Sequence, residues 1–165
     1  MNIIKANESH IDAIISIADI TWRHTYKKII SQEQINYMLQ LFYNEKTLRE
    51  QMHNPKHHFR AFIQNEELLG YAHCIEDDTD CNIIKLSKLY VLPQSQGKGI
   101  GKLLLLFIEN ECYELKKNTI TLNVNRANPA KNFYLKQGFE ITQEIDIPLD
   151  KFWLNDYVME KNIEI

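Results

Sequence analysis

Leu89-Tyr90-Val91-Leu92-Pro93-Gln94-Ser95-Gln96-Gly97-Lys98-Gly99-Ile100-Gly101-Lys102 is the stretch that decides the fold, and Leu103-Leu104-Leu105-Leu106-Phe107-Ile108 follows it directly. The pattern predicts a strand, a glycine-rich turn and a helix. Three of the five glycines of the chain stand here, so backbone amides can approach a ligand without intervening side chains. A helix start adds unpaired N–H groups and partial positive charge, and Lys98 and Lys102 add whole charges. The stretch therefore predicts a phosphate-binding turn.

Two familiar phosphate-binding loops fail to match this spacing. A nucleotide P-loop requires glycine at the position of Gln96 and a hydroxyl residue at the position of Leu103. The dinucleotide fingerprint G-x-G-x-x-G would begin at Gly97, but Lys102 stands at its third glycine. It also requires an acidic residue about 20 positions later at the end of a strand, and none is found there. The turn is therefore expected to bind a phosphate of another kind.

The spacing Gln96-Gly97-Lys98-Gly99-Ile100-Gly101 resembles the Q/R-x-x-G-x-G/A loop of the GNAT acetyltransferases. Upstream, Lys88-Leu89-Tyr90-Val91-Leu92-Pro93 is similar to that family's x-L-Y-V-x-P strand end. Downstream, Asn128-Pro129-Ala130-Lys131-Asn132-Phe133-Tyr134-Leu135-Lys136-Gln137-Gly138-Phe139 resembles its N-P-A-x-x-F-Y-x-x-x-G-F signature. A flexible turn before a core helix would explain the glycines alone, but two ordered motifs favour the family.

In that family the loop holds the pyrophosphate of acetyl-coenzyme A, so the resemblance implies acetyl-coenzyme A as cosubstrate. Main-chain groups of the preceding strand pair with the pantetheine arm, and one amide there faces the thioester oxygen. Many members place the motif asparagine one position earlier, where this chain has Ala127. The implied coenzyme-binding residues are Leu89, Tyr90, Val91, Gln96, Gly97, Lys98, Gly99, Ile100, Gly101, Lys102, Asn128, Lys131 and Tyr134.

Length and composition indicate one domain over residues 1–165. The chain of 165 residues is 44% hydrophobic and 25% charged, enough to bury about 70% of its unfolded surface around one core. Cys74, Cys81 and Cys112 form no C-x-x-C pair, so neither a disulfide framework nor a metal site is expected. With no signal peptide and no apolar run of about 18 residues, we expect a cytoplasmic protein without a membrane partner.

The charge pattern argues against nucleic acid as a partner. The net charge is −3 and the pI is near 6.1, and no basic stripe is visible. Two interpretations fit the one acidic run, Glu76-Asp77-Asp78-Thr79-Asp80. It is either a solvated hairpin loop or a site that attracts a cationic acceptor.

Hydrophobic periodicity predicts alternating strands and helices without linkers or repeats. Ser9 is expected to cap the first helix, and Glu109 and Glu111 are expected to face solvent from the fourth. This order favours an α/β (α+β) fold with one mixed, mostly antiparallel sheet of about seven strands and helices on both faces. The GNAT resemblance adds a V-shaped splay between strands four and five. Strands are expected over residues 2–6, 58–64, 67–76, 82–91, 119–124, 139–147 and 152–159, and helices over 9–26, 31–42, 44–53, 99–117 and 129–137.

Acetyl transfer to an amine requires a proton acceptor for the ammonium, an oxyanion donor and an acid for the departing thiolate. Tyr134 matches the family's tyrosine near the sulfur, its usual general acid. A phenol with a pKa near 10 is protonated at pH 7 and can donate to a thiolate whose free pKa is near 8.5. The competing interpretation is that Tyr134 only packs against Phe133 and Phe139.

The base is less clearly marked. Many relatives carry a glutamate in an x-E-x-L-Y-V pattern, and the matching residue here is Ser87. His73, in the middle of an expected strand, is the candidate base, acting through water because a histidine pKa suits the task. The competing interpretation is a structural histidine. Further candidates by location are Glu33, Glu45 and Asp156, and a water chain to solvent would need no dedicated base.

The acceptor is indicated only by a second resemblance. Thr21-Trp22-Arg23-His24-Thr25-Tyr26 and Asn155-Asp156-Tyr157-Val158-Met159 look like parts of the PaiA-type branch, whose members acetylate spermidine and spermine. The resemblance implies a primary amine acceptor, polyamine-like and small, attacked directly in a ternary complex. Its pocket residues are expected to be Trp22, Tyr26, Tyr37 and Asp156, where aromatic faces tolerate cations.

Two other functions are also compatible with the sequence. One is acetylation of a protein N-terminus or lysine, because one fold serves many amines. The other is a non-catalytic sensor that binds coenzyme A, which the missing strand-four glutamate allows and the intact Tyr134 opposes. Both a monomer and a homodimer are compatible with the sequence.

Overall fold

A seven-stranded mixed sheet forms the middle of the molecule, and the computed structural model describes it over residues 2–164. The strand order is β1-β2-β3-β4-β5-β7-β6. The strands are β1 (Asn2–Lys5), β2 (His57–Gln64), β3 (Glu67–Glu76), β4 (Ile83–Val91), β5 (Thr119–Asn125), β6 (Glu140–Leu149) and β7 (Phe152–Asn162). The helices are α1 (Ile11–Tyr26), α2 (Gln32–Phe42), α3 (Glu45–His53), α4 (Ile100–Glu114) and α5 (Ala130–Lys136), with short 3-10 turns at Glu8–His10 and Pro93–Ser95. The α/β fold class expected from the sequence is confirmed.

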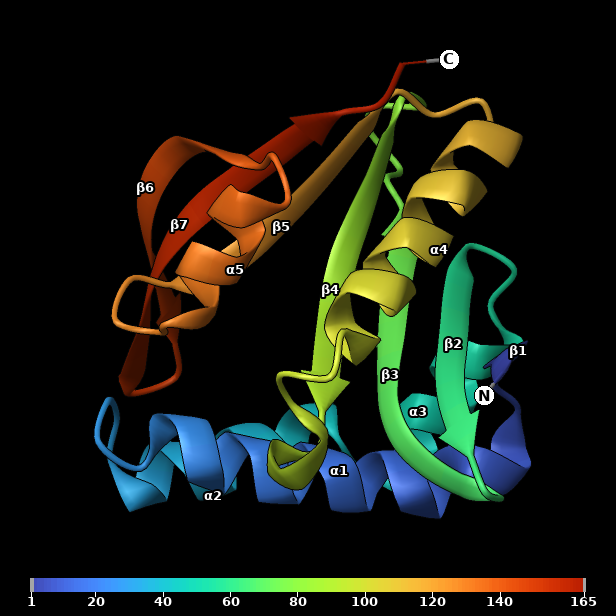
Figure 1. Ribbon diagram of the computed structural model, residues 1–165. Helices are drawn as coiled ribbons and strands as arrows, with labels where there is room; N and C mark the ends of the chain where they lie inside the picture. The colour runs from blue at the N-terminus through green and yellow to red at the C-terminus, as the bar shows by residue number, and fades with distance from the viewer. Residues whose placement is uncertain (1, 165) are drawn as a thin grey trace.

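The sheet opens into a V between β4 and β5 (Figure 1). These two strands pair in parallel over only three positions, from Ile83 opposite Thr119 to Lys85 opposite Thr121, and then diverge. Just beyond this point the β3–β4 register shifts by one residue, so Ser87 is an extra residue in β4. A bulge bends and twists its strand, which helps turn the end of β4 away from β5. The splay predicted between strands four and five is confirmed.

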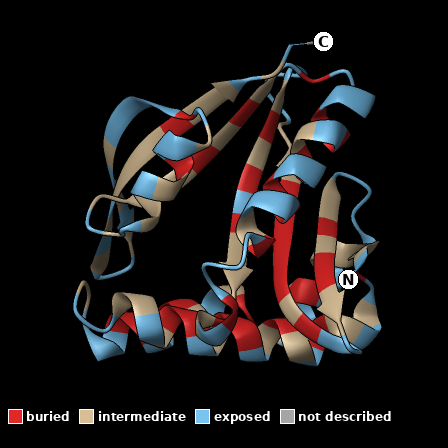
Figure 2. Cartoon of the chain, viewed as in Figure 1, coloured by how far each residue is buried: buried red, intermediate tan, exposed pale blue. Residues whose placement is uncertain are grey.

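Helices cover both faces of the sheet. Leu104, Leu105 and Ile108 of α4 are buried with Tyr134 of α5 on one face. On the other face, α1 and α3 pack against β2 and β3 around Ile14, Leu48 and Tyr71. The chain crosses the open end of the V through α1 and α2, as Figure 1 shows. The strand β3 lies between the two layers and is buried along most of its length (Figure 2).

Three details differ from the sequence-based expectations. The first helical segment is capped by Asn7, whose side chain accepts from the backbone N–H of Ser9, so Ser9 is not the cap. Helix α4 ends at Glu114 and not at residue 117, because Lys116 takes a left-handed φ of 56°. Glu111 does not face solvent: it is buried and pairs with Arg60 of β2. Among residues 2–164, no helix is long and apolar enough to cross a membrane.

Candidate active site

A cleft of about 490 Å³ runs along the glycine-rich turn between the end of β4 and the start of α5. We call it the glycine-loop cleft. It brings together ten of the residues predicted to contact the coenzyme: Leu89, Val91, Gln96, Gly97, Gly99, Ile100, Gly101, Lys102, Asn128 and Tyr134. Three others lie outside it. Tyr90 turns to a neighbouring cavity, Lys98 is exposed, and the Lys131 ammonium lies 5.3 Å from the ring centre of Tyr157.

Two glycines give the turn its shape. Gly97 and Gly99 have φ angles of 76° and 82°, a left-handed conformation that other residues adopt at an energetic cost. A Cβ placed on either would meet no atom within 4 Å, so the backbone borders open space. Gly99 immediately precedes α4, whose first N–H groups have no partner within the helix. The turn can therefore present several amides to one anion.

The end of β4 is held close to β3 and left free on its other edge. A Cβ on Gly70 would stand 2.8 Å from the carbonyl oxygen of Tyr90, so only glycine allows this approach. Because β5 pairs with β4 only as far as Lys85, no strand within residues 2–164 lies beside the main chain from Leu89 to Val91 on the open side of the V. Unpaired strand edges accept an extended ligand as an added strand.

Tyr134 stands where the glycine-loop cleft meets the interior. Its ring packs edge-on against Phe133 and Phe139, with centroids 5.3 and 5.6 Å away, and 9% of the residue is exposed. Burial, and secondarily the nearby Tyr26, raise the pKa of the Tyr134 phenol. The hydroxyl therefore stays protonated through the neutral range and can donate. Tyr134 therefore packs in the core and also lines the cleft, and its role as the general acid stays a prediction.

A narrow junction of about 140 Å³ joins this cleft to the interior of the V, and Tyr134 lines both. Here the Asn128 side-chain amide donates to the hydroxyl of Tyr26 over 3.0 Å, and its oxygen accepts from the backbone of Ala130 over 2.9 Å. Asn128 therefore fixes the start of α5 and the end of α1 at once.

The junction leads to a second cavity of about 300 Å³, which we call the aromatic cavity. The indole N–H of Trp22 donates to the hydroxyl of Tyr90 over 3.1 Å and lies 3.3 Å from that of Tyr43. These two hydroxyls share a hydrogen bond of 2.9 Å. Of the four residues predicted for the acceptor pocket, Trp22, Tyr26 and Asp156 line this cavity. Tyr37 does not, since its ring packs on Phe152 at 5.4 Å.

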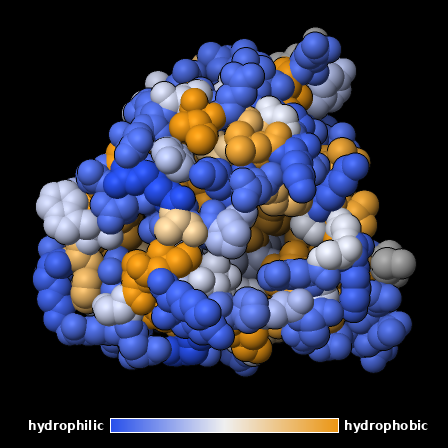
Figure 3. Space-filling model, turned by 60° about the vertical axis from the view of Figure 1, so that its left-hand side comes forward, coloured by the Kyte–Doolittle hydropathy of each residue, from blue (hydrophilic) through white to orange (hydrophobic). Residues whose placement is uncertain are grey.

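Three charged side chains line the aromatic cavity: Asp156, Lys85 and Lys88. Burial raises the pKa of the Asp156 carboxyl, while a hydrogen bond from Asn123 opposes that shift. Burial lowers the pKa of the Lys88 amine to about 8, and its ammonium lies 5.6 Å from the ring centre of Tyr43. The cavity is thus an aromatic chamber of nearly balanced charge. On the one face of the molecule that Figure 3 shows, apolar patches border a hollow in a mostly hydrophilic surface.

The proton acceptors proposed from the sequence lie in different places. His73 is fully buried and lines none of these three cavities. Its Nδ1 stands 3.1 Å from the Lys88 ammonium nitrogen, so it reaches the aromatic cavity only through Lys88. Glu33 pairs with Lys151 and Glu45 pairs with Arg49, outside the cavities. Asp156 is the one carboxylate among these candidates that borders the aromatic cavity.

Sequence reasoning missed Lys88 and Tyr43 as parts of the site. Lys88 follows the extra residue of β4, and a bulge changes which face of the sheet a side chain reaches. Tyr43 stands in the short connection between α2 and α3, where no periodic pattern reports burial. Its only sequence signal was an aromatic residue just before the helix-capping Asn44.

Comparisons with known proteins agree with this geometry. The family model described as acetyltransferase (GNAT) domain matches residues 26–161. A spermidine N(1)-acetyltransferase from Thermoplasma acidophilum is 30% identical over 171 residues, which cover 99% of this chain and 98% of that protein. The crystal structure of the PaiA N-acetyltransferase from Thermoplasma acidophilum in complex with coenzyme A superimposes with a TM-score of 0.85 at 26% identity, covering 98% of both chains.

A third relative matches a shorter region. The ribosomal protein bS18-alanine N-acetyltransferase of Haemophilus influenzae is 35% identical over 85 residues, which cover 52% of this chain and 54% of that protein. The family match spans most of the chain, and the PaiA-type relative spans nearly all of it. The chain therefore belongs to the GNAT acetyltransferase family, whose members transfer an acetyl group from acetyl-coenzyme A to an amine.

Proposed function

We propose that this enzyme acetylates one primary amine of a small, polyamine-like acceptor by direct attack on acetyl-coenzyme A in a ternary complex. One observation carries the proposal. The aromatic cavity opens through the junction onto Tyr134, so an amine and a thioester can meet from opposite sides. Holding the two reactants together supplies a large part of the rate enhancement for an activated thioester.

The donor would lie in the glycine-loop cleft. The amides of the turn and the start of α4, with Lys102 beside them, would hold its pyrophosphate. The pantetheine arm would pair with the free edge of β4, which sets an amide near Leu89 against the thioester oxygen. Tyr134 would then donate its phenolic proton to the departing thiolate.

The acceptor would lie in the aromatic cavity. The rings of Trp22, Tyr43 and Tyr90 can cover a methylene chain and tolerate a cation. Asp156 supplies one carboxylate for a second ammonium group, while Lys85 and Lys88 oppose a crowded polycation. A diamine or a polyamine bound through one end therefore suits the cavity better than an acceptor that buries several charges.

The similar proteins support the same class of acceptor. The protein from Thermoplasma acidophilum that is 30% identical over nearly the full chain is named a spermidine N(1)-acetyltransferase. Protein N-terminal acetylation is the second candidate, favoured by the half-chain likeness to the bS18-alanine enzyme. That reaction would place a peptide in the cavity, whose far wall is formed by Ile147 and Leu154 of the β6–β7 hairpin.

One assay separates these possibilities. The enzyme is incubated with acetyl-coenzyme A and single acceptors while the release of free thiol is followed. The acceptors are putrescine, spermidine, spermine, an aliphatic monoamine, an aminoglycoside, lysine, and peptides with a free N-terminal alanine. We expect the highest kcat/KM with diamines and polyamines. A preference for the alanine peptides would establish the second candidate, and thermal stabilisation by coenzyme A without turnover of any amine would indicate a sensor.

A further inference from the structure

Three nitrogen side chains form a continuous line from the aromatic cavity to the surface. The Lys88 amine nitrogen lies 3.1 Å from His73 Nδ1, and His73 Nε2 lies 3.0 Å from His57 Nδ1. The residues stand on the neighbouring strands β4, β3 and β2, and His73 is the cross-strand partner of Lys88. Lys88 and His73 are buried, whereas His57 is partly exposed at the start of β2.

While an acceptor fills the aromatic cavity, this line offers a proton a route to the surface that does not pass through the cavity. The His73 ring stacks on Phe59 at 3.9 Å, which closes one of its faces. Among residues 2–164, no salt bridge gives Lys88, His73 or His57 a carboxylate partner. A buried lysine normally retains its charge only with such a partner. Here its hydrogen-bonding partner is an imidazole, which can itself accept a proton.

One arrangement of hydrogens would let the two histidines carry a proton outward. Each nitrogen-to-nitrogen contact holds one hydrogen, so a lysine that donates to His73 Nδ1 requires the neutral His73 to carry its hydrogen on Nε2. His73 then donates to His57 Nδ1, and His57 carries its hydrogen on Nε2 toward solvent. All three groups therefore point the same way, from the cavity outward.

We infer that Lys88 is the base that deprotonates the acceptor ammonium, and that the proton leaves the site through His73 and His57. This inference rests on the proposed function, since Lys88 lines both the aromatic cavity and the junction where the amine would attack. Lys88 is thus a catalytic residue. His73 and His57 act through it and touch no substrate.

Each step of this relay moves one proton between two nitrogen atoms, or from a nitrogen atom to water. The acceptor R–NH3⁺ gives a proton to the neutral Lys88 amine, and R–NH2 attacks the thioester. The nitrogen loses its second proton as the tetrahedral intermediate collapses, and that proton replaces the one that Tyr134 gives to the departing thiolate. Lys88 passes a proton to His73 Nδ1, His73 Nε2 passes one to His57 Nδ1, and His57 Nε2 releases one to water. After product release, a proton entering at His57 restores both ring tautomers and leaves Lys88 as the ammonium, which loses its proton to water in the emptied cavity.

The groups around the line keep a proton from staying on either histidine. Burial first, then Lys88 and the neighbouring histidines, hold the pKa of His73 well below its ordinary value, so it passes on a proton and does not keep one. At the outer end, burial, Lys88 and His58 lower the pKa of His57, and Asp78 opposes them. Around Lys88 stand Tyr43, Tyr90, Lys85 and Asp156, and burial keeps its pKa near the working range at about 8.

The catalytic test uses Lys88→Met with Lys85→Met as its matched control. Both remove a lysine from the same cavity, but only Lys88 contacts His73. We expect K88M to lower kcat by about 100-fold or more and to remove the inflection near pH 8 from the profile of kcat/KM. We expect K85M to change the KM of the acceptor and to keep that inflection. A K88M enzyme with the wild-type kcat and pH profile would overturn the inference.

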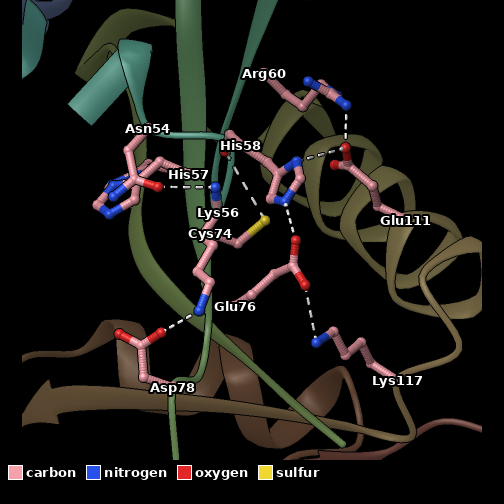
Figure 4. A network of polar contacts seen from close by, with 11 residues as sticks. Asn54, Lys56, His57, His58, Arg60, Cys74, Glu76, Asp78, Glu111 and Lys117 are labelled. Carbon is pink, nitrogen blue, oxygen red and sulfur yellow. Dashed lines mark hydrogen bonds and ion pairs between the residues drawn. The ribbon is translucent and has the colours of Figure 1, made fainter. Parts of the chain in front are cut away.

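The outer end of the proton route, at His57, is tested with His57→Ala, and His58→Ala is the matched control. The two side chains are adjacent in sequence but point to opposite sides in Figure 4. We expect H57A to lose about 10-fold in kcat and to recover as imidazole buffer is added, because the buffer can take the proton from His73. We expect the rate of H58A to be independent of imidazole. Absence of rescue in H57A would remove His57 from the route.

A measurement without turnover keeps this test separate from the proposed function. In uniformly ¹⁵N-labelled wild-type protein, NMR reports the ring tautomers of His73 and His57 and the titration of the Lys88 amine. We expect both rings to be protonated at Nε2 and Lys88 to lose its proton near pH 8. A Lys88 that stays protonated above pH 10 overturns the relay even in an active enzyme. If no amine in the panel is acetylated, the proposed function fails instead.

Discussion

Asn128 donates its side-chain amide to the hydroxyl of Tyr26 over 3.0 Å, although 102 positions separate the two residues in the chain. The bond crosses the open side of the V, from the loop before α5 to the last residue of α1. Because both residues also line the junction, the same contact that ties the two arms together shapes the passage between donor and acceptor.

Removing the Tyr26 hydroxyl should therefore lower the stability of the fold and weaken the binding of the acceptor. In Tyr26→Phe the partly buried Asn128 amide loses its partner, which costs about 1 kcal/mol. We expect the Tm to fall by about 2–4 °C and the KM of the acceptor to rise about fivefold. Thermal unfolding and steady-state kinetics measure both. Tyr37→Phe is the control, because Tyr37 packs on Phe152 outside the cavities, and equal changes in both variants would contradict the role of the junction.

The acid is tested by Tyr134→Phe. This change keeps the ring between Phe133 and Phe139 but removes the proton that the thiolate would receive. We expect kcat to fall by about 10- to 1000-fold, with the Kd for coenzyme A unchanged in calorimetry. Tyr113→Phe, at an exposed position on α4, should retain full activity. A Y134F enzyme with wild-type kcat would take Tyr134 out of the mechanism.

The glycine-rich turn is tested by Gly99→Val. A β-branched residue is strained at a φ of 82°, and its side chain would occupy the open space in front of the amides. Since such strain costs about 1–3 kcal/mol, we expect coenzyme A to bind at least about 10-fold more weakly. Gly138→Ala is the matched control, with a φ of 86° at the end of α5 and away from the cleft. It should lower stability and leave the Kd for coenzyme A as in wild type.

Sequence patterns predicted the scaffold better than the interior of the site. Alternating strands and helices predicted the sheet and the glycine-rich turn, because each depends on neighbours in the chain. The splay and the place of Tyr134 were expected from the resemblance to the GNAT family. Lys88, by contrast, reaches the aromatic cavity beyond an extra residue in β4. Its contact with His73 depends on the pairing of two strands, which no local spacing encodes. The three aromatic residues expected in the acceptor pocket, Trp22, Tyr26 and Tyr37, could not be divided into lining and packing positions for the same reason.

The burial of Glu111 was missed for a related cause. The sequence pattern of α4 predicts that Glu111 faces solvent. In the folded chain, β2 places Arg60 beside Glu111, and the two side chains form an ion pair. Figure 4 shows the resulting network, in which His58 lies between Glu111 and Glu76, and Lys117 contacts Glu76. The acidic run that begins at Glu76 therefore has different roles along its length. Its first carboxylate joins this network, while Asp77 accepts hydrogen bonds within the loop from Thr79 and Asp80.

Glu76 should make the stability of the fold depend on pH in the acid range. A hydrogen bond from Lys117 at 2.9 Å and one with His58 at 3.1 Å hold the pKa of Glu76 below its ordinary value of 4.5. A carboxyl whose pKa is lower in the folded state stabilises the fold above its unfolded pKa, and loses that effect as the pH falls through the folded pKa.

In Glu76→Gln we expect the free energy of unfolding to fall by about 1–2 kcal/mol at pH 7 and to decline less between pH 5 and pH 3. Urea unfolding across this range measures both, with Glu50→Gln, exposed on α3, as the control. A Glu76→Gln profile parallel to that of the wild type would show that Glu76 does not carry the acid sensitivity.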